Sequence, residues 1–108
     1  METTLLGLAL PKVLKKLKEM LVYQGFIVQT MPTANPVLIA NKKGNWLNKP
    51  RQFIIEITSE NNNTTRINIT AIIKNMKNNH HAEEILEVNF SSKLYTVFNK
   101  IIQRPYGI

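Results

Sequence analysis

The fold follows from two stretches of sequence, QFIIEIT (residues 52–58) and RINITAIIK (residues 66–74). Apolar and polar residues alternate in both stretches, which is typical of strands with one buried face. A hairpin folded about Asn62 brings the apolar positions into three opposing pairs, Ile57 with Ile67, Ile55 with Ile69 and Phe53 with Ala71. A slip of one residue would turn this whole set toward water, so the sequence predicts this register.

The other face of the hairpin is mostly polar. It carries Glu56, Arg66 and Asn68, but also Ile54 and Ile72. We expect these two isoleucines to form a small apolar spot on an exposed sheet face.

The segment that precedes the hairpin predicts a helix followed by two strands. Residues 11–24 form an amphipathic helix, because Val13, Leu14, Leu17, Met20 and Leu21 recur at helical spacing. Pro11 suits the first turn, and Gly25 suits the residue after the helix, where positive φ is common. Residues 26–31 and 37–43 are short apolar runs that predict two strands, joined by a turn that contains two prolines. Residues 41–51 predict a loop with Trp46 and Leu47 as its apolar anchors.

The C-terminal part admits two interpretations. In the first, residues 82–103 form one long helix with Asn79 as its N-cap, and its apolar stripe comprises Leu86, Phe90, Leu94, Val97, Phe98 and Ile101. In the second, residues 85–90 alternate as a fifth strand, and Ser91 caps a shorter helix that begins at Ser92. We take the long helix as the prediction.

Together these elements predict one α+β domain that spans residues 1–108. The expected architecture is a two-layer sandwich, in which a four-stranded antiparallel sheet carries an N-terminal and a C-terminal helix on one face. The other face would be open to solvent or to a partner. The apolar run at residues 5–10 is expected to pack against this domain.

Composition narrows the class of protein. The chain of 108 residues has no cysteine, which excludes a disulfide scaffold, a Cys-ligated zinc site and a thiol enzyme. The apolar run at residues 5–10 is too short for a signal peptide or a membrane span. We therefore expect a soluble cytoplasmic protein without a membrane span.

Residues that could carry chemistry are few. His80 and Glu84 stand one helical turn apart, but no further histidine completes a metal site, so we expect no metal and no cofactor. Ser91 or Ser92 could belong to a Ser–His–acid triad, but nothing nearby indicates an activated hydroxyl. The four glycines are far apart and form no phosphate-binding loop. The sequence predicts no enzyme.

The charge distribution is the most informative feature. The chain carries a net charge of +7, and residues 11–51 account for all of it with eight bases and one acid. Such a localised basic surface attracts nucleic acid or another polyanion. The candidate contact residues are Lys12, Lys15, Lys16, Lys18, Lys42, Lys43, Trp46, Lys49 and Arg51. Trp46 stands among bases, where an indole can stack on an unpaired nucleobase.

The leading hypothesis is a small non-enzymatic binding module whose basic first half contacts an anionic partner such as nucleic acid. The alternative is a ligand-binding or scaffold domain that forms homo-oligomers through the open sheet face, with Ile54 and Ile72 at the contact.

Overall fold

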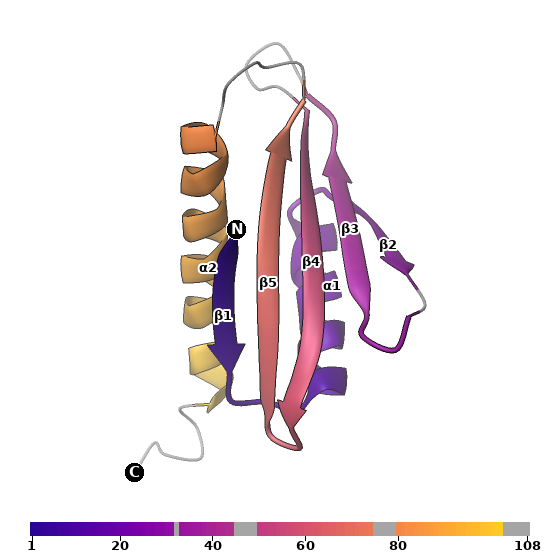
Figure 1. Ribbon diagram of the computed structural model, residues 1–108, viewed down its shortest axis with the longest axis vertical. Coiled ribbons are helices and arrows are strands. Elements are labelled where there is room, and N and C mark those ends of the chain that lie inside the picture. Colours follow the sequence, from indigo (N-terminus) through magenta and orange to yellow (C-terminus); the bar gives the residue numbers. More distant parts are fainter. Residues whose placement is uncertain (32, 45–49, 75–79, 103–108) are drawn as a thin grey trace.

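The computed structural model describes residues 1–31, 33–44, 50–74 and 80–102. Seven elements follow one another along the chain: β1 (Glu2–Leu6), α1 (Leu10–Tyr23), β2 (Ile27–Met31), β3 (Val37–Lys42), β4 (Arg51–Asn61), β5 (Thr64–Ile73) and α2 (His80–Ile102). The strands form one antiparallel sheet in the order β1-β5-β4-β3-β2 (Figure 1). The predicted α+β class is confirmed.

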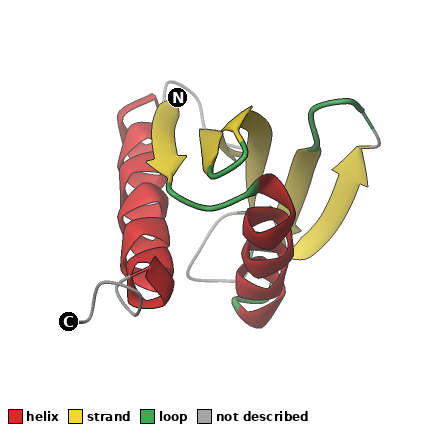
Figure 2. Cartoon of the chain, turned by 90° about the horizontal axis from the view of Figure 1, so that it is seen from below, coloured by secondary structure: helices red, strands yellow, loops and turns green. Residues whose placement is uncertain are grey.

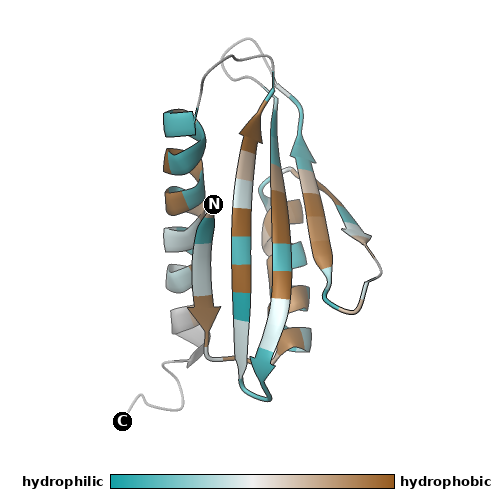
Figure 3. Cartoon of the chain, in the orientation of Figure 1, coloured by the Kyte–Doolittle hydropathy of each residue, from teal (hydrophilic) through white to brown (hydrophobic). Residues whose placement is uncertain are grey.

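The β4–β5 hairpin has the predicted register. Its three inner pairs are Ile57 with Ile67, Ile55 with Ile69 and Phe53 with Ala71. The strands run further than predicted, to Asn61 and Thr64, because the ladder tolerates a register shift between Ser59 and Asn61. At the turn the side chain of Asn61 accepts a hydrogen bond of 2.9 Å from the amide of Asn63, a local bond that is common in Asn-rich turns. The hydropathy colouring alternates along both strands (Figure 3).

The expectation of four strands is wrong, because β1 adds a fifth at the edge of β5. In β1, Thr4 and Leu6 are buried, while Thr3 and Leu5 are exposed, which is the period of two of a half-buried strand. The alternative fifth strand at residues 85–90 is excluded, since these residues lie within α2. The apolar run at 5–10 does pack on the core, but it spans the end of β1, a bend at Gly7 and the start of α1.

Both helices bury one stripe against the sheet face that carries Phe53. Helix α1 buries Val13, Leu17 and Leu21, and α2 buries Phe90, Leu94 and Phe98. Figure 2 shows α2 beside β1 and α1 beneath the middle strands. As predicted, Gly25 follows α1 with φ of 92°, and the long helix 82–103 is confirmed through Ile102; its predicted N-cap, Asn79, lies outside the described residues.

The core joins the two layers through aromatic contacts. The ring of Phe53 stacks on Phe90 at 4.6 Å between centroids and lies 5.5 Å from Phe26. On the opposite sheet face, Ile54 and Ile72 are only half-buried, and Ile39 lies directly across from Ile54. Within the described ranges, neither helix has the length and apolarity needed to cross a membrane.

Candidate anion-binding groove

A groove runs between α1 and α2 on the helical side of the molecule. One end of this groove is a hollow of about 310 Å³ near the start of α1 and the C-terminal half of α2. We call it the lower hollow; it is lined by Leu8, Lys12, Lys15, Lys16, Glu19 and Phe98. These α1 residues recur every three or four positions, so one flank of the helix forms the wall. Phe98 and Leu8 give the hollow an apolar floor.

A second hollow continues the groove along both helices. It has a volume of about 280 Å³ and shares Lys16 and Glu19 with the lower hollow. Met20 and Tyr23 extend the α1 wall, and Val97 supplies the α2 wall.

Beyond Tyr23 and Val97 lies a third hollow of about 460 Å³, which we call the upper chamber. It shares no described lining residue with the other two hollows, and we call the line of three hollows the groove. Residues from β3, β4, α2 and the α1–β2 connection line the upper chamber: Gln24, Phe26, Lys42, Arg51, Phe53, Leu86, Asn89, Phe90 and Lys93. The lining includes the cluster of three phenylalanines that joins the layers.

Two cations of the upper chamber are placed by the sheet register. Lys42 ends β3 and Arg51 begins β4, and their Cα atoms are direct partners across the two strands. Both lie on the same face as Ala40 and Phe53, so they point toward the helices rather than the open side. The ammonium of Lys42 lies 5.5 Å from the ring centroid of Phe26, within range of a cation–π interaction. Lys93 approaches from α2.

The groove is strongly cationic. Lys12, Lys15 and Lys16 face Glu19 in the lower hollow, and the described lining of the upper chamber contains no carboxylate. The ion pairs among described residues involve Glu60, Glu83 and Glu87, none of which pairs with a groove cation. The positive charge is therefore available to a ligand.

Five of the nine predicted contact residues line hollows of the groove, but not the same one. Lys12, Lys15 and Lys16 line the lower hollow, whereas Lys42 and Arg51 line the upper chamber. Lys18 follows Lys16 by two positions, which puts it on the other flank of α1, and it is absent from the described groove lining. Lys43 is exposed just after β3 and also lies outside that lining. Trp46 and Lys49 lie outside the described residues.

Sequence reasoning missed Lys93. It lies in the half of the chain that is neutral overall, so the charge count gave no reason to select it. The available signal was its spacing, because Lys93 follows Phe90 by three residues and therefore lies beside the apolar stripe of α2.

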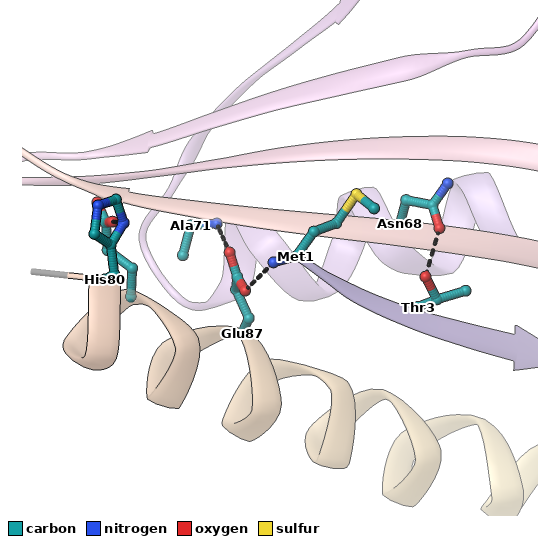
Figure 4. Close-up of polar contacts among 7 residues, drawn as sticks. Met1, Thr3, Asn68, Ala71, His80 and Glu87 are labelled. Carbon is teal, nitrogen blue, oxygen red and sulfur yellow. Dashed lines mark hydrogen bonds and ion pairs between the residues drawn. The ribbon is translucent and has the colours of Figure 1, made fainter.

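Glu83 and Glu87 of α2 contact the edge of β5, and Figure 4 shows the contacts of Glu87. Glu87 accepts a hydrogen bond of 2.7 Å from the backbone amide of Ala71, and Glu83 accepts one of 2.9 Å from Ile73. The other oxygen of Glu87 lies 2.8 Å from the amine of Met1, and this hydrogen bond raises the pKa of the amine. Nearby on the outer face, Thr3 donates to Asn68. Glu83 and Glu87 thus hydrogen-bond the edge of β5, whereas Glu84 is exposed.

The other candidate chemical groups are held in structural contacts. The imidazole of His80 lies 3.9 Å from Glu83, whose carboxylate also holds the Ile73 amide. The hydroxyl of Ser91 is buried against that of Thr4. Over the part of the chain that the structure describes, no three histidine or acidic side chains gather as metal ligands would.

No known family model, curated protein or solved structure matches this chain.

Proposed function

We propose that this chain is a non-enzymatic binding module whose interhelical groove holds an anionic polymer, with single-stranded nucleic acid as the class that fits best. One observation carries the proposal: the described lining of the three hollows contains six cations, Lys12, Lys15, Lys16, Lys42, Arg51 and Lys93, and one carboxylate, Glu19. Phosphodiester charges recur along a strand, so they match cations that recur along a groove.

The shape of the groove supports a flexible strand. Lys12 and Lys16 lie about one turn apart on α1, about 6 Å along its axis. The line of hollows leads from them to the upper chamber, which Lys42 and Arg51 line. Lys12 and Lys15 are exposed on α1, whereas Lys42 and Arg51 are half-buried at the sheet, so the cations border the groove from open to enclosed positions. The backbone of an extended single strand can follow such a line of cations. The predicted stacking of Trp46 on a base belongs to this proposal and would contribute about 1–3 kcal/mol on single strands.

The test is fluorescence anisotropy with a labelled single-stranded oligonucleotide between about 50 and 200 mM salt. The combined change Lys12→Gln, Lys15→Gln and Lys16→Gln should weaken binding and flatten the dependence of log K on log salt. Each lost phosphate contact should reduce the slope by about 0.7 on a single strand. Lys18→Gln is the matched control, because this lysine is on the same helix but not in the described groove lining.

Two outcomes would contradict the proposal. The first is no binding by the wild-type protein even at the lowest salt. The second is an equal loss from Lys18→Gln and from a single groove change such as Lys16→Gln, which would indicate attraction by net charge alone.

The second candidate function is homo-oligomerisation through the open sheet face. It is favoured by the outer apolar residues, since Ile39 and Ile54 lie directly opposite each other and Ile72 is half-buried nearby. A self-associating protein should show a mass by analytical ultracentrifugation that rises with concentration and hardly depends on salt. Ile54→Thr keeps a β-branched residue on this face and should lower that mass to one chain. A single-chain mass for the wild-type protein at all concentrations excludes this candidate.

A further inference from the structure

The upper chamber contains a pair of like charges that the sheet forces together. Lys42 and Arg51 are direct partners on adjacent antiparallel strands, and both are half-buried. Like charges directly opposite each other in a sheet are destabilising. None of the ion pairs among described residues neutralises either of them. This pair therefore destabilises the fold, whereas the hydrogen bonds that Glu83 and Glu87 accept at the sheet edge stabilise it.

The cations are also positioned before any ligand arrives. The ring of Phe26 holds the Lys42 ammonium at 5.5 Å, and β4 fixes the base of the Arg51 side chain. Lys93 supplies a third cation from α2, so the positive groups come from three separate elements. The side-chain amides of Gln24 and Asn89 add hydrogen-bond donors to the same lining.

We infer that the upper chamber is a binding pocket for a compact phosphoryl group with more than one negative charge, such as a phosphate monoester or a diphosphate. The three cations of the chamber carry more charge than a single carboxylate ligand could neutralise. A phosphate monoester carries about −1.5 to −2 at neutral pH and therefore matches the site better. A guanidinium binds two phosphoryl oxygens at once, and lysine ammonium groups complete the charge. The volume of about 460 Å³ lies within the range of small-ligand sites.

This inference rests on the proposed function and deepens it, because it assigns one end of the groove to a terminal phosphate. The same chemistry could come from the 5′-phosphate of a strand or from a free phosphorylated small molecule. Two probes separate these sources. They are inorganic pyrophosphate and a pair of oligonucleotides that differ only in a 5′-phosphate or a 5′-hydroxyl.

The first experiment measures the melting temperature of the protein with and without pyrophosphate at constant ionic strength. We expect pyrophosphate to raise the Tm of the wild-type protein by about 5 °C or more at saturation. Lys42→Gln and Arg51→Gln should remove most of this rise. Without ligand, the same variants should melt at or above the wild-type temperature, because each removes the like-charge pair. Lys43→Gln changes the exposed lysine next to Lys42, outside the described lining, and should keep the full rise.

The second experiment compares the two oligonucleotides by anisotropy. Tighter binding of the 5′-phosphorylated strand, lost in Arg51→Gln, assigns the pocket to a strand end. Equal binding of both strands, together with a pyrophosphate-dependent rise in Tm, assigns it to a free phosphorylated molecule. Both results support the pocket.

The inference is overturned if pyrophosphate leaves the wild-type Tm unchanged, or if Lys42→Gln and Arg51→Gln keep the full rise. In that case oligonucleotide binding that depends on Lys12, Lys15 and Lys16 would leave the proposed function standing. Conversely, a rise in Tm without any oligonucleotide binding would keep the pocket and remove the nucleic-acid proposal.

Discussion

The two sides of the sheet differ in how their backbone groups are hydrogen-bonded and in how exposed their side chains are. At the edge of β5, β1 pairs along residues 65–69, and beyond β1 the amides of Ala71 and Ile73 donate to Glu87 and Glu83 of α2. At the other edge, β2 pairs with β3 on one side only, and Ile27 and Met31 are 64% and 45% exposed. Helix α2 therefore accepts hydrogen bonds from two β5 amides that β1 does not reach, and no comparable side-chain contact to β2 is found among the described residues.

This difference shows that side chains of a helix can accept hydrogen bonds from strand amides that no neighbouring strand reaches. Carboxylates four residues apart on α2 reach amides two residues apart on β5, so the helix matches the spacing of outward-facing strand amides. Strand β2 has neither a charged residue nor a proline, the two features that usually protect an exposed edge from pairing. The open edge thus offers a route to self-association that is distinct from the open sheet face.

The largest expected effect comes from matched truncations at the two edges. Leu6→Ala in β1 should lower the free energy of unfolding by about 2–5 kcal/mol, because Leu6 is 1% exposed and its loss leaves a cavity. Ile27→Ala in β2 should cost less than about 1 kcal/mol, since most of its side chain is already in water. Urea melts measure both. Similar losses from the two variants would mean that the edges do not differ in burial.

A smaller effect is expected from the carboxylate that completes the β5 edge. Glu87 is 4% exposed, so Glu87→Ala should cost about 1–3 kcal/mol by leaving the Ala71 amide without its acceptor. Glu84→Ala on the same helix turn is the control, because Glu84 is exposed and should change stability by less than about 0.5 kcal/mol. Faster hydrogen exchange at Ala71 in Glu87→Ala would locate the loss. Equal stability of the two variants would contradict a stabilising role for the hydrogen bond between Glu87 and the Ala71 amide.

The smallest effect on stability is expected in the middle of the open edge. Gln29→Lys should change the free energy of unfolding by less than about 0.5 kcal/mol, because Gln29 is exposed on β2. If two copies pair through β2 in antiparallel fashion, the introduced ammonium groups would approach each other and the assembly should dissociate. Sedimentation at several concentrations measures this. An assembly that survives the change does not use this edge.

The hairpin was predictable because its apolar residues leave only one register that buries them together. Ile55, Ile57, Ile67 and Ile69 all become fully buried as that register requires. Strand β1 was not predictable in the same way, since Leu5 to Leu10 forms one apolar run that hides the boundary between strand, bend and helix. Its partner strand is distant in sequence, and no local pattern indicates such a pairing.

The candidate groove was predictable only in part. The excess of bases in residues 11–51 pointed to Lys12, Lys15, Lys16, Lys42 and Arg51, which line it. Charge counting could not separate Lys18 from its neighbours, because that depends on the orientation of α1 against the sheet. It also could not bring Lys93 to the other end of the groove, since only the packing of α2 places that residue there.

The pairing of β1 with β5 joins two strands that are far apart in the sequence and are therefore synthesised at different times. Leu6 lies opposite Thr65, and Glu2 lies opposite Ile69, so β1 pairs with a strand that is synthesised much later. At a synthesis rate of about 5–20 residues per second, the delay lasts several seconds. During this delay Leu5 and Leu6 lack the strand with which they pair. This edge can therefore close only after β5 has been made, and such non-local pairing slows folding.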